Sequence, residues 1–338
     1  MQGVSFVSLT HPGNTSEPPD VQPKSDMKKA MFLVCGEALM DVFSAGQTAT
    51  GVALDARVGG SPFNVAVGLA RLNQPVGFFS ALSTGFLGQR LLGALHEEAV
   101  DTTFVKRSPA PTTLSVVGLD AHGVPSYAFY GDRCADRLLT LDDLPPAGTP
   151  MHALHVGSYA TVVEPTASTL RALIEREHGR TLIAYDPNVR LNVEPDLARW
   201  RDHLNWMLPR TDLLKVSDED LQLLLPDTAL ASFAEDALTK GVKAVVVTRG
   251  ARGALAWTAQ ARAVVPGLAV DVIDTVGAGD TFQAALLTWL AEHGALSAAA
   301  LAALPEAGLQ SALQFAARAA AITCSRRGAD MPRRAEVA

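Results

Sequence analysis

Short apolar segments alternate with helix-length amphipathic segments from residue 31 to about residue 250. The apolar segments predict strands at 32–35, 77–82, 153–158, 181–186, 212–216 and 244–248. The segments between them predict helices at 62–72, 85–100, 165–178, 195–208, 218–225 and 229–240. Continuous apolar strands separated by helices are typical of a parallel sheet covered on both faces. We therefore expect an α/β domain in three layers, with a mainly parallel central sheet between two layers of helices.

Two regions, at about 41–58 and 103–137, interrupt this alternation. They contain β-type stretches at 113–119 and 127–130 without intervening helices. We expect them to form a small antiparallel sheet inserted into the large domain. Ligands of α/β sheets bind beyond the carboxyl ends of the strands, so a sheet inserted there would act as a lid.

The remaining segments set the domain boundaries. Residues 1–30 are rich in Pro, Ser, Thr and Asn and lack periodicity, which predicts a flexible leader or a start codon placed too far upstream. Residues 31–330 are expected to form one large domain and residues 331–338 a short tail. Within that domain, strands at 254–258 and 261–265 precede a turn at Asp274 and three final helices.

Composition argues against several partners and compartments. The formal net charge is −7, whereas a nucleic-acid-binding surface is normally basic. The chain has no apolar run of the ~18 residues that a membrane span needs. Three cysteines at wide spacings indicate neither a disulfide framework nor a zinc site. We therefore expect a cytoplasmic protein that binds neither nucleic acid nor membrane.

A glycine turn at 277–279 is the strongest functional signal. Gly277-Ala278-Gly279-Asp280 follows a strand-like run and opens a long amphipathic helix. Main-chain amides at a helix start form an anion site, and glycines allow close approach of a phosphate. Asp280 could accept a proton from an alcohol beside that site, or it could simply cap the helix. The combination predicts transfer of a phosphoryl group to a hydroxyl.

A second glycine motif, Gly59-Gly60-Ser61-Pro62-Phe63-Asn64, precedes the first predicted helix. Proline suits the first turn of a helix, and Asn64 would lie close to the helix start. Its amide could bind sugar hydroxyls or could cap the helix locally. Taken alone, this motif leaves both interpretations open.

With these motifs in place, the chain resembles the ribokinase-like, or PfkB-type, family of carbohydrate kinases, and within it the bacterial fructokinases. The resemblance spans about residues 31–330. The segments that carry it, in the family's order, are 35–41, 59–66, 82–88, 127–130, 186–190, 215–220, 247–253 and 274–280.

The resemblance assigns roles position by position. Asp280 matches the catalytic base, and Gly277, Ala278 and Gly279 match the anion hole. Positions matching sugar contacts are Asp41, Gly59, Gly60, Asn64, Phe129 and Arg190. Positions matching the nucleotide site are Ser217, Asp220, Thr248, Gly250 and Gly253. The resemblance also implies Mg²⁺ bound with ATP, contacted through water by Asp220, and Asp274 and Thr275 match the neighbourhood of a monovalent-cation (K⁺) site.

Two positions depart from the family pattern. Relatives commonly carry Asn-x-x-Glu near the Mg²⁺–phosphate site, whereas this chain has Ser217 and Asp220. A carboxylate is retained one methylene shorter, so water-mediated contact with Mg²⁺ remains feasible. The helix expected beside the adenine has Ala317 where relatives often have asparagine, which makes a strict preference for ATP less secure than kinase activity.

The resemblance implies an ATP-dependent kinase that phosphorylates a primary hydroxyl of a ketohexose, with D-fructose as the first candidate. One alternative is a 2-keto-3-deoxygluconate kinase or another sugar or nucleoside kinase of the family, with Arg107 or Arg190 pairing with a substrate carboxylate. A second is a non-catalytic sugar-binding regulator, which would predict loss of Asp280 or of the glycine turn. Family members often pair through their lid sheets, so a homodimer is expected, with apolar area from Val116, Leu119 and Phe129.

Overall fold

The computed structural model describes residues 30–119 and 125–337, so the leader expected over 1–30 lies outside the described residues except for residue 30. The described residues form a nine-stranded sheet in the order β13-β12-β11-β10-β9-β8-β1-β4-β5. Its neighbours are parallel from β5 to β11 and antiparallel from β11 to β13. The mainly parallel sheet predicted from the sequence is confirmed. The strands are β1 (Met31–Cys35), β4 (Val76–Ser83), β5 (Val105–Ser108), β8 (Met151–Gly157), β9 (Leu182–Asp186), β10 (Leu213–Ser217), β11 (Ala244–Thr248), β12 (Ala254–Thr258) and β13 (Arg262–Val265).

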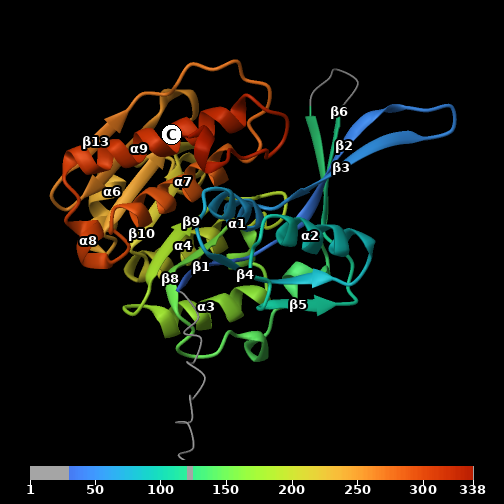
Figure 1. Ribbon diagram of the computed structural model, residues 1–338, viewed down its shortest axis with the longest axis horizontal. Helices are drawn as coiled ribbons and strands as arrows, with labels where there is room; N and C mark the ends of the chain where they lie inside the picture. Colours follow the sequence, from blue (N-terminus) through green and yellow to red (C-terminus); the bar gives the residue numbers. More distant parts are fainter. Residues whose placement is uncertain (1–29, 120–124, 338) are drawn as a thin grey trace, which may run out of the picture.

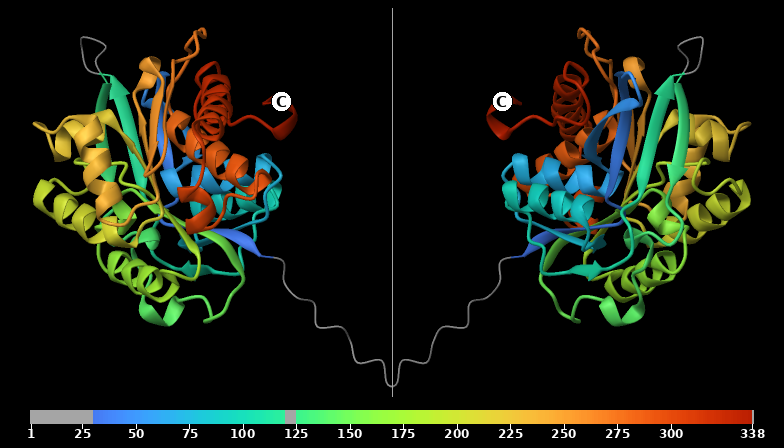
Figure 2. Two further views of the ribbon diagram at one scale, coloured as in Figure 1. Left: turned by 90° about the vertical axis from the view of Figure 1, so that its left-hand side faces the viewer. Right: turned by 90° about the vertical axis from the view of Figure 1, so that its right-hand side faces the viewer.

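Helices cover both faces of this sheet, which completes the three layers (Figure 2). One layer contains α1 (Ser61–Arg71), α2 (Phe86–Glu97), α7 (Ala278–Glu292), α8 (Ala298–Ala302) and α9 (Glu306–Cys324). The other contains α3 (Thr166–Glu177), α4 (Leu197–Met207), α5 (Asp218–Leu224) and α6 (Leu230–Thr239). Alternate side chains of a strand point to opposite faces. Phe32 and Val34 of β1 accordingly join the first apolar core, and Leu33 and Cys35 join the second.

A second sheet of four strands stands beside one end of the large sheet, and its β2–β3 hairpin extends away from the body (Figure 1). Its strands are β2 (Leu39–Gln47), β3 (Val52–Gly59), β6 (Leu114–Leu119) and β7 (Pro125–Tyr130), in the order β3-β2-β6-β7. The sequence predicted an antiparallel sheet, but β2 and β6 are parallel. Parallel neighbours need a long crossover, and here the chain passes through α1, β4, α2 and β5 of the large domain between them.

The segment 103–137, expected to belong to the small sheet, divides between both sheets. β5 pairs in parallel with β4 at the edge of the large sheet, whereas β6 and β7 build the small sheet. The four residues of β5, Val105-Lys106-Arg107-Ser108, are too few and too polar to reveal which sheet will accept them. Only the register with β4, from Val105 opposite Ser80 to Ser108 opposite Ser83, decides it.

Residues 331–337, expected as part of a tail, pack against the domain. Met331 and Val337 are each 1% exposed, and Arg334 forms an ion pair with Glu292 of α7 at 2.9 Å. Residue 338 lies outside the described residues. Within the described part of the chain, helices are too short or too polar to cross a bilayer.

Candidate active site

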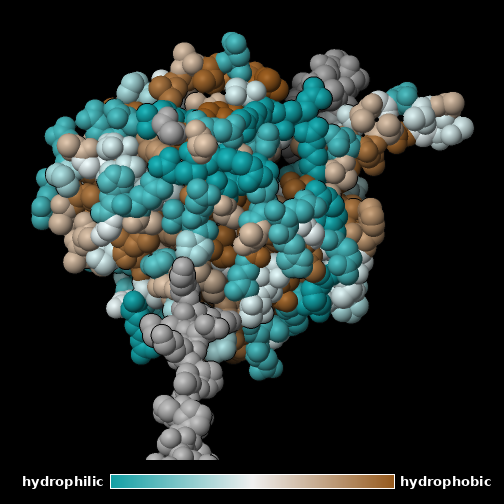
Figure 3. All heavy atoms as spheres, in the orientation of Figure 1, coloured by the Kyte–Doolittle hydropathy of each residue, from teal (hydrophilic) through white to brown (hydrophobic). Residues whose placement is uncertain are grey.

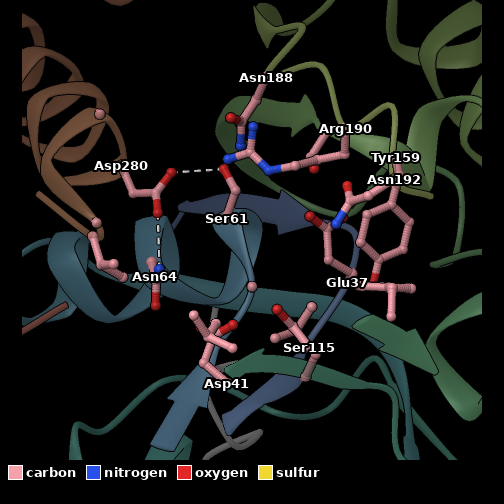
Figure 4. Close-up of a pocket in the computed structure, with 18 of the residues that line it drawn as sticks. Glu37, Asp41, Ser61, Asn64, Ser115, Tyr159, Asn188, Arg190, Asn192 and Asp280 are labelled. Atoms are coloured by element: carbon pink, nitrogen blue, oxygen red, sulfur yellow. Dashed lines mark hydrogen bonds between the residues drawn. The ribbon is translucent and has the colours of Figure 1, made fainter. Parts of the chain in front are cut away.

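A cavity of about 420 Å³ lies between the small sheet, the start of α1 and the start of α7 (Figure 4). It collects side chains from segments far apart in the sequence. Six of the positions expected to serve catalysis or the sugar are on its wall together: Asp41, Gly60, Asn64, Phe129, Arg190 and Asp280. Gly277 and Gly279 of the glycine turn also line it.

Asp280 lies in the first turn of α7 and is 9% exposed. The Ser61 hydroxyl donates to its Oδ1 at 2.7 Å, and the Asn64 amide donates to its Oδ2 at 2.8 Å (Figure 4). Burial raises the pKa of Asp280, while the hydrogen bonds from Asn64 and Ser61 and the charge of Lys215 oppose that shift. The carboxyl group therefore faces the cavity in an orientation fixed by two donors from α1.

The turn that precedes Asp280 has a backbone that favours glycine. Gly277 adopts φ +77°, and a Cβ there would lie 2.6 Å from the Cβ of Ala329. Asp274 braces the turn, because its Oδ1 accepts from the Val276 amide at 3.0 Å and its Oδ2 from the Gly328 amide at 2.8 Å. Asp274 was expected near a monovalent cation, and both of its carboxylate oxygens already accept hydrogen bonds from the main chain. A K⁺ ion beside them would use their remaining lone pairs.

Glycines 59 and 60 lie where β3 leads into α1, beside the cavity. Gly60 adopts φ +105°, and a Cβ there would lie 2.8 Å from the carbonyl oxygen of Glu37. Gly59 is absent from the cavity wall, but a Cβ on it would lie 2.2 Å from Oδ2 of Asp41. Its small size therefore gives Asp41 room to point inward. Burial raises the pKa of Asp41, and a hydrogen bond from the Ser115 hydroxyl opposes that shift.

An aromatic pair forms the side of the cavity beneath the small sheet. The rings of Phe129 and Tyr159 meet edge to face with centroids 5.5 Å apart. The guanidinium of Arg137 stacks on both rings, at 5.3 Å from Phe129 and 5.4 Å from Tyr159. Sequence reasoning identified Phe129 but missed Tyr159, which lies in a short 3₁₀ turn after β8. Its only signal was an aromatic residue just beyond the end of a predicted strand.

A buried ion pair near the glycine turn was also missed. Lys215 Nζ lies 2.7 Å from Oδ2 of Asp186, and their side chains are only 5% and 3% exposed. Lys215 lines the cavity, and its Nζ would be 3.2 Å from a Cβ placed on Gly279. A cation therefore stands next to the main-chain amides of the turn. A lysine among the apolar residues of the strand predicted at 212–216 was the signal that could have revealed it.

A second cavity, of about 290 Å³, lies on the other side of the glycine turn. It brings together Thr248, Gly250 and Gly253, three of the positions expected at the nucleotide, and Ala317 of α9. Its wall is mostly aliphatic and includes residues of the loop that precedes α7. The apolar residues exposed on that loop give brown surface at the top of Figure 3: Leu268, Val270, Val272 and Ile273.

The two cavities share a boundary. Thr275 and Gly279 line both of them, so the glycine turn separates a polar chamber from an apolar one. Thr275, which was expected near a monovalent cation, lies at this junction.

Two further expected nucleotide positions, Ser217 and Asp220, line neither cavity. Ser217 caps α5 by accepting from the Asp220 amide at 3.0 Å, and Asp220 Oδ1 accepts from the Val189 amide at 3.0 Å. Among the described residues no cluster of three or more His, Cys, Asp or Glu side chains forms a metal cage. A Mg²⁺ ion usually keeps several waters and binds one or two carboxylates plus phosphates. Asp220 and Oδ1 of Asp186, which has no hydrogen-bond partner among the described residues, suit that mode.

This three-layer fold, with its glycine turn between two chambers, is that of a carbohydrate kinase. The family model described as pfkB family carbohydrate kinase matches residues 29–335. Because the match covers almost the whole chain, the protein belongs to this family.

Individual relatives narrow the resemblance. The chain is 36% identical over 280 residues to a fructokinase of Rhizobium leguminosarum bv. trifolii, covering 83% of this chain and 86% of the relative. The structure of fructokinase with bound ATP from Xylella fastidiosa matches with a TM-score of 0.82 and 29% identity, covering 90% of this chain and 96% of that one. A fructokinase of Vibrio cholerae O395 bound to fructose, ADP and calcium matches with a TM-score of 0.72 and 27% identity, covering 89% and 94%.

Proposed function

We propose that this protein is an ATP-dependent fructokinase, which transfers the γ-phosphoryl group of ATP to a primary hydroxyl of D-fructose. The observation that carries the proposal is the junction of the two cavities at the Gly277–Gly279 turn, with Asp280 facing the polar chamber. A sugar in the polar chamber and a nucleotide in the apolar one would meet at this turn. The fructokinases among its relatives support fructose as the sugar.

In the proposed reaction, Asp280 accepts the proton of the attacking hydroxyl. The sugar oxygen bonds to the γ-phosphorus while the bond from that phosphorus to the bridging oxygen of ADP breaks. Phosphoryl transfer depends mainly on positioning and on electrostatic stabilisation. Main-chain amides of Gly277, Ala278 and Gly279 would stabilise the negative charge from one side, and the Lys215 ammonium would do so from another. Mg²⁺ bound with ATP supplies further positive charge, and Asp220 and Asp186 would contact it through water.

The proposed sugar contacts surround the attacking hydroxyl. Asp41 and the Gly60 main chain would bind hydroxyls of the sugar, and Asn64 would share its amide between Asp280 and the substrate. Phe129 would pack against the sugar from the small sheet, which we propose acts as a lid. Arg190 faces the same chamber.

One alternative within the family is a kinase for 2-keto-3-deoxygluconate, and Arg190 is the observation that favours it. A guanidinium on the cavity wall could pair with a substrate carboxylate. Arg107, the other candidate partner, instead donates to the Ser83 carbonyl at 2.6 Å and does not line the cavity. The carboxyl group of Asp41, half-buried on the same wall, would oppose an anionic substrate. This balance favours a neutral sugar.

An ADP-release assay separates the two substrates. The purified protein is given ATP and Mg²⁺ with D-fructose, D-ribose, adenosine or 2-keto-3-deoxygluconate in parallel. We expect kcat/KM for fructose to exceed the others by at least about tenfold. A preference for 2-keto-3-deoxygluconate would replace the proposal with the alternative, and fructose binding without any ADP release would point to a non-catalytic sugar-binding protein.

Three further properties belong to this proposal. We propose a homodimer that pairs through the small sheets, where Val52 and Leu54 are 59% and 57% exposed; the side chain of Leu119 lies outside the described residues. We also propose activation by K⁺ beside Asp274 and Thr275, and a cytoplasmic location, where ATP is available. Light scattering during gel filtration and assays with and without K⁺ test the first two.

A further inference from the structure

Glu37 is a buried carboxyl group that the proposed mechanism does not use. It lies in the segment between β1 and β2, lines the polar cavity and is 1% exposed. Among the described residues its Oε2 has no hydrogen-bond partner. Leaving a buried polar atom unpaired costs roughly 1–3 kcal/mol, so such atoms are rare unless something binds them.

The surroundings of Glu37 orient it toward the cavity. The Ser158 hydroxyl, at a residue with φ +56°, donates to its carboxyl group. Asp136 is close by and is itself bound by Thr113 and by the Tyr159 hydroxyl at 2.8 Å. In Figure 4 Glu37 lies beside Tyr159, on the other side of the cavity from Asp280. A molecule that places one hydroxyl at Asp280 therefore extends toward Glu37.

Burial and neighbouring groups also set the protonation state of Glu37. Burial raises its pKa to about 8, and the nearby charge of Asp136 adds to that shift while Ser158 and Arg190 oppose it. At neutral pH the side chain is mainly the uncharged acid, which can donate one hydrogen bond and accept others. A hydroxyl is the natural partner of such a group, because it can also donate and accept.

We propose that Glu37 is a specificity-determining residue, whose carboxyl group binds a sugar hydroxyl remote from the one that is phosphorylated. This inference rests on the proposed fructokinase activity and deepens it. It explains how the chamber selects a sugar that carries a hydroxyl at this position, since a deoxy sugar would leave Glu37 unpaired. A site built to bind a hydroxyl discriminates strongly against analogues that lack it.

Monodeoxy sugars test the assignment. kcat/KM is measured for D-fructose and for its 1-, 3-, 4- and 6-deoxy analogues with wild type, Glu37→Leu and Glu37→Gln. Some analogues keep the hydroxyl that is phosphorylated. For at least one of these, kcat/KM of wild type should be about 10- to 100-fold lower than for fructose, which corresponds to the loss of a buried hydrogen bond. For Glu37→Leu, kcat/KM for that analogue and for fructose should agree within about threefold. Relative to wild type, the lower kcat/KM for fructose should come from a higher KM. Glu37→Gln keeps a donor and an acceptor, so it should retain the discrimination.

Controls separate this role from folding. The ratio of two substrates on one variant does not depend on the fraction of folded enzyme. Replacing a desolvated carboxyl group by leucine is expected to leave the melting temperature equal or higher. Glu177→Gln changes another buried glutamate, which pairs with Arg176 outside the cavity, and should leave every ratio unchanged.

Two kinds of failure remain distinguishable. If wild type releases no ADP with fructose, the proposed function is wrong. If wild type is active but Glu37→Leu discriminates among the analogues as wild type does, or Glu37→Gln loses discrimination as Glu37→Leu should, the assignment of Glu37 is overturned.

Discussion

The two cavities that meet at the Gly277–Gly279 turn are built in different ways. Polar side chains line the first, and other polar side chains hold several of them in place: Ser61 and Asn64 hold Asp280, Ser115 holds Asp41, and Ser158 holds Glu37. Small and aliphatic residues line most of the second, with glycines at Gly250 and Gly253. The first can therefore recognise individual hydroxyls, whereas the second recognises mainly shape and main-chain contacts. Substitutions in the first should change turnover or discrimination, and those in the second should change only nucleotide affinity.

The largest effect is expected for Asp280→Asn. Asparagine keeps the size of the side chain but cannot accept the proton of the sugar hydroxyl. We expect kcat to fall by about 10²–10⁴ while fructose still raises the melting temperature. Asp236→Asn, at a surface ion pair on α6, is the matched control. A kcat close to that of wild type would show that Asp280 is not the base.

The next effect tests the space around Asp41. In Gly59→Ala the new Cβ would lie 2.2 Å from Asp41 Oδ2, so the carboxyl group must turn away. We expect KM for fructose to rise about 10- to 100-fold, as for a lost hydrogen bond to a charged or buried group, with little change in KM for ATP. Gly118→Ala in β6 is the control, because a Cβ there meets no atom of the described residues within 4 Å. An unchanged KM for fructose would mean that Asp41 does not hold the sugar.

A substitution in the second cavity should have the opposite pattern. Ala317→Leu adds volume where α9 lines the apolar chamber. Overpacking of this kind should raise KM for ATP about tenfold and leave KM for fructose unchanged. Ala307→Leu, on the exposed first turn of α9, should change neither constant. If Ala317→Leu instead raised KM for fructose, the assignment of the sugar to the first cavity and the nucleotide to the second would be wrong.

The smallest effect concerns stability at different pH values. The pKa of Glu37 is raised to about 8, first by burial and then by Asp136, with Ser158 and Arg190 opposing. The folded state therefore holds this proton more tightly than the unfolded state, and the contribution of Glu37 to stability falls as pH rises from about 4.5 to 8. Glutamine does not titrate. The melting temperature of Glu37→Gln minus that of wild type should grow by about 2–5 °C between pH 5 and pH 8. A constant difference across this range would contradict the shift.

Much of the fold could be predicted from local patterns. The six strands from 32–35 to 244–248 appeared in the structure within about two residues of their expected ends, because continuous apolar runs and amphipathic periods are properties of neighbouring residues. The start of α7 could also be predicted, since Gly277 adopts a left-handed backbone that favours glycine and the helix after it buries a stripe of apolar residues.

The pairing of strands that are distant in the sequence could not be predicted in the same way. The parallel contact of β2 with β6 and the placement of β5 at the edge of the large sheet depend on which partner a short strand meets. The sequence alone therefore determined the layered α/β architecture and the glycine motifs of a carbohydrate kinase.

Tertiary structure decided how the site is assembled. Ser61 and Asp280 are 219 positions apart, yet they form one hydrogen bond, and Glu37, Tyr159 and Lys215 reach the same chamber from three separate segments. Local patterns encode burial and turns, but they do not encode which buried polar groups will face each other. Which polar groups face each other is decided when distant elements pack together, because each buried polar group then needs a hydrogen bond from the protein or from a ligand.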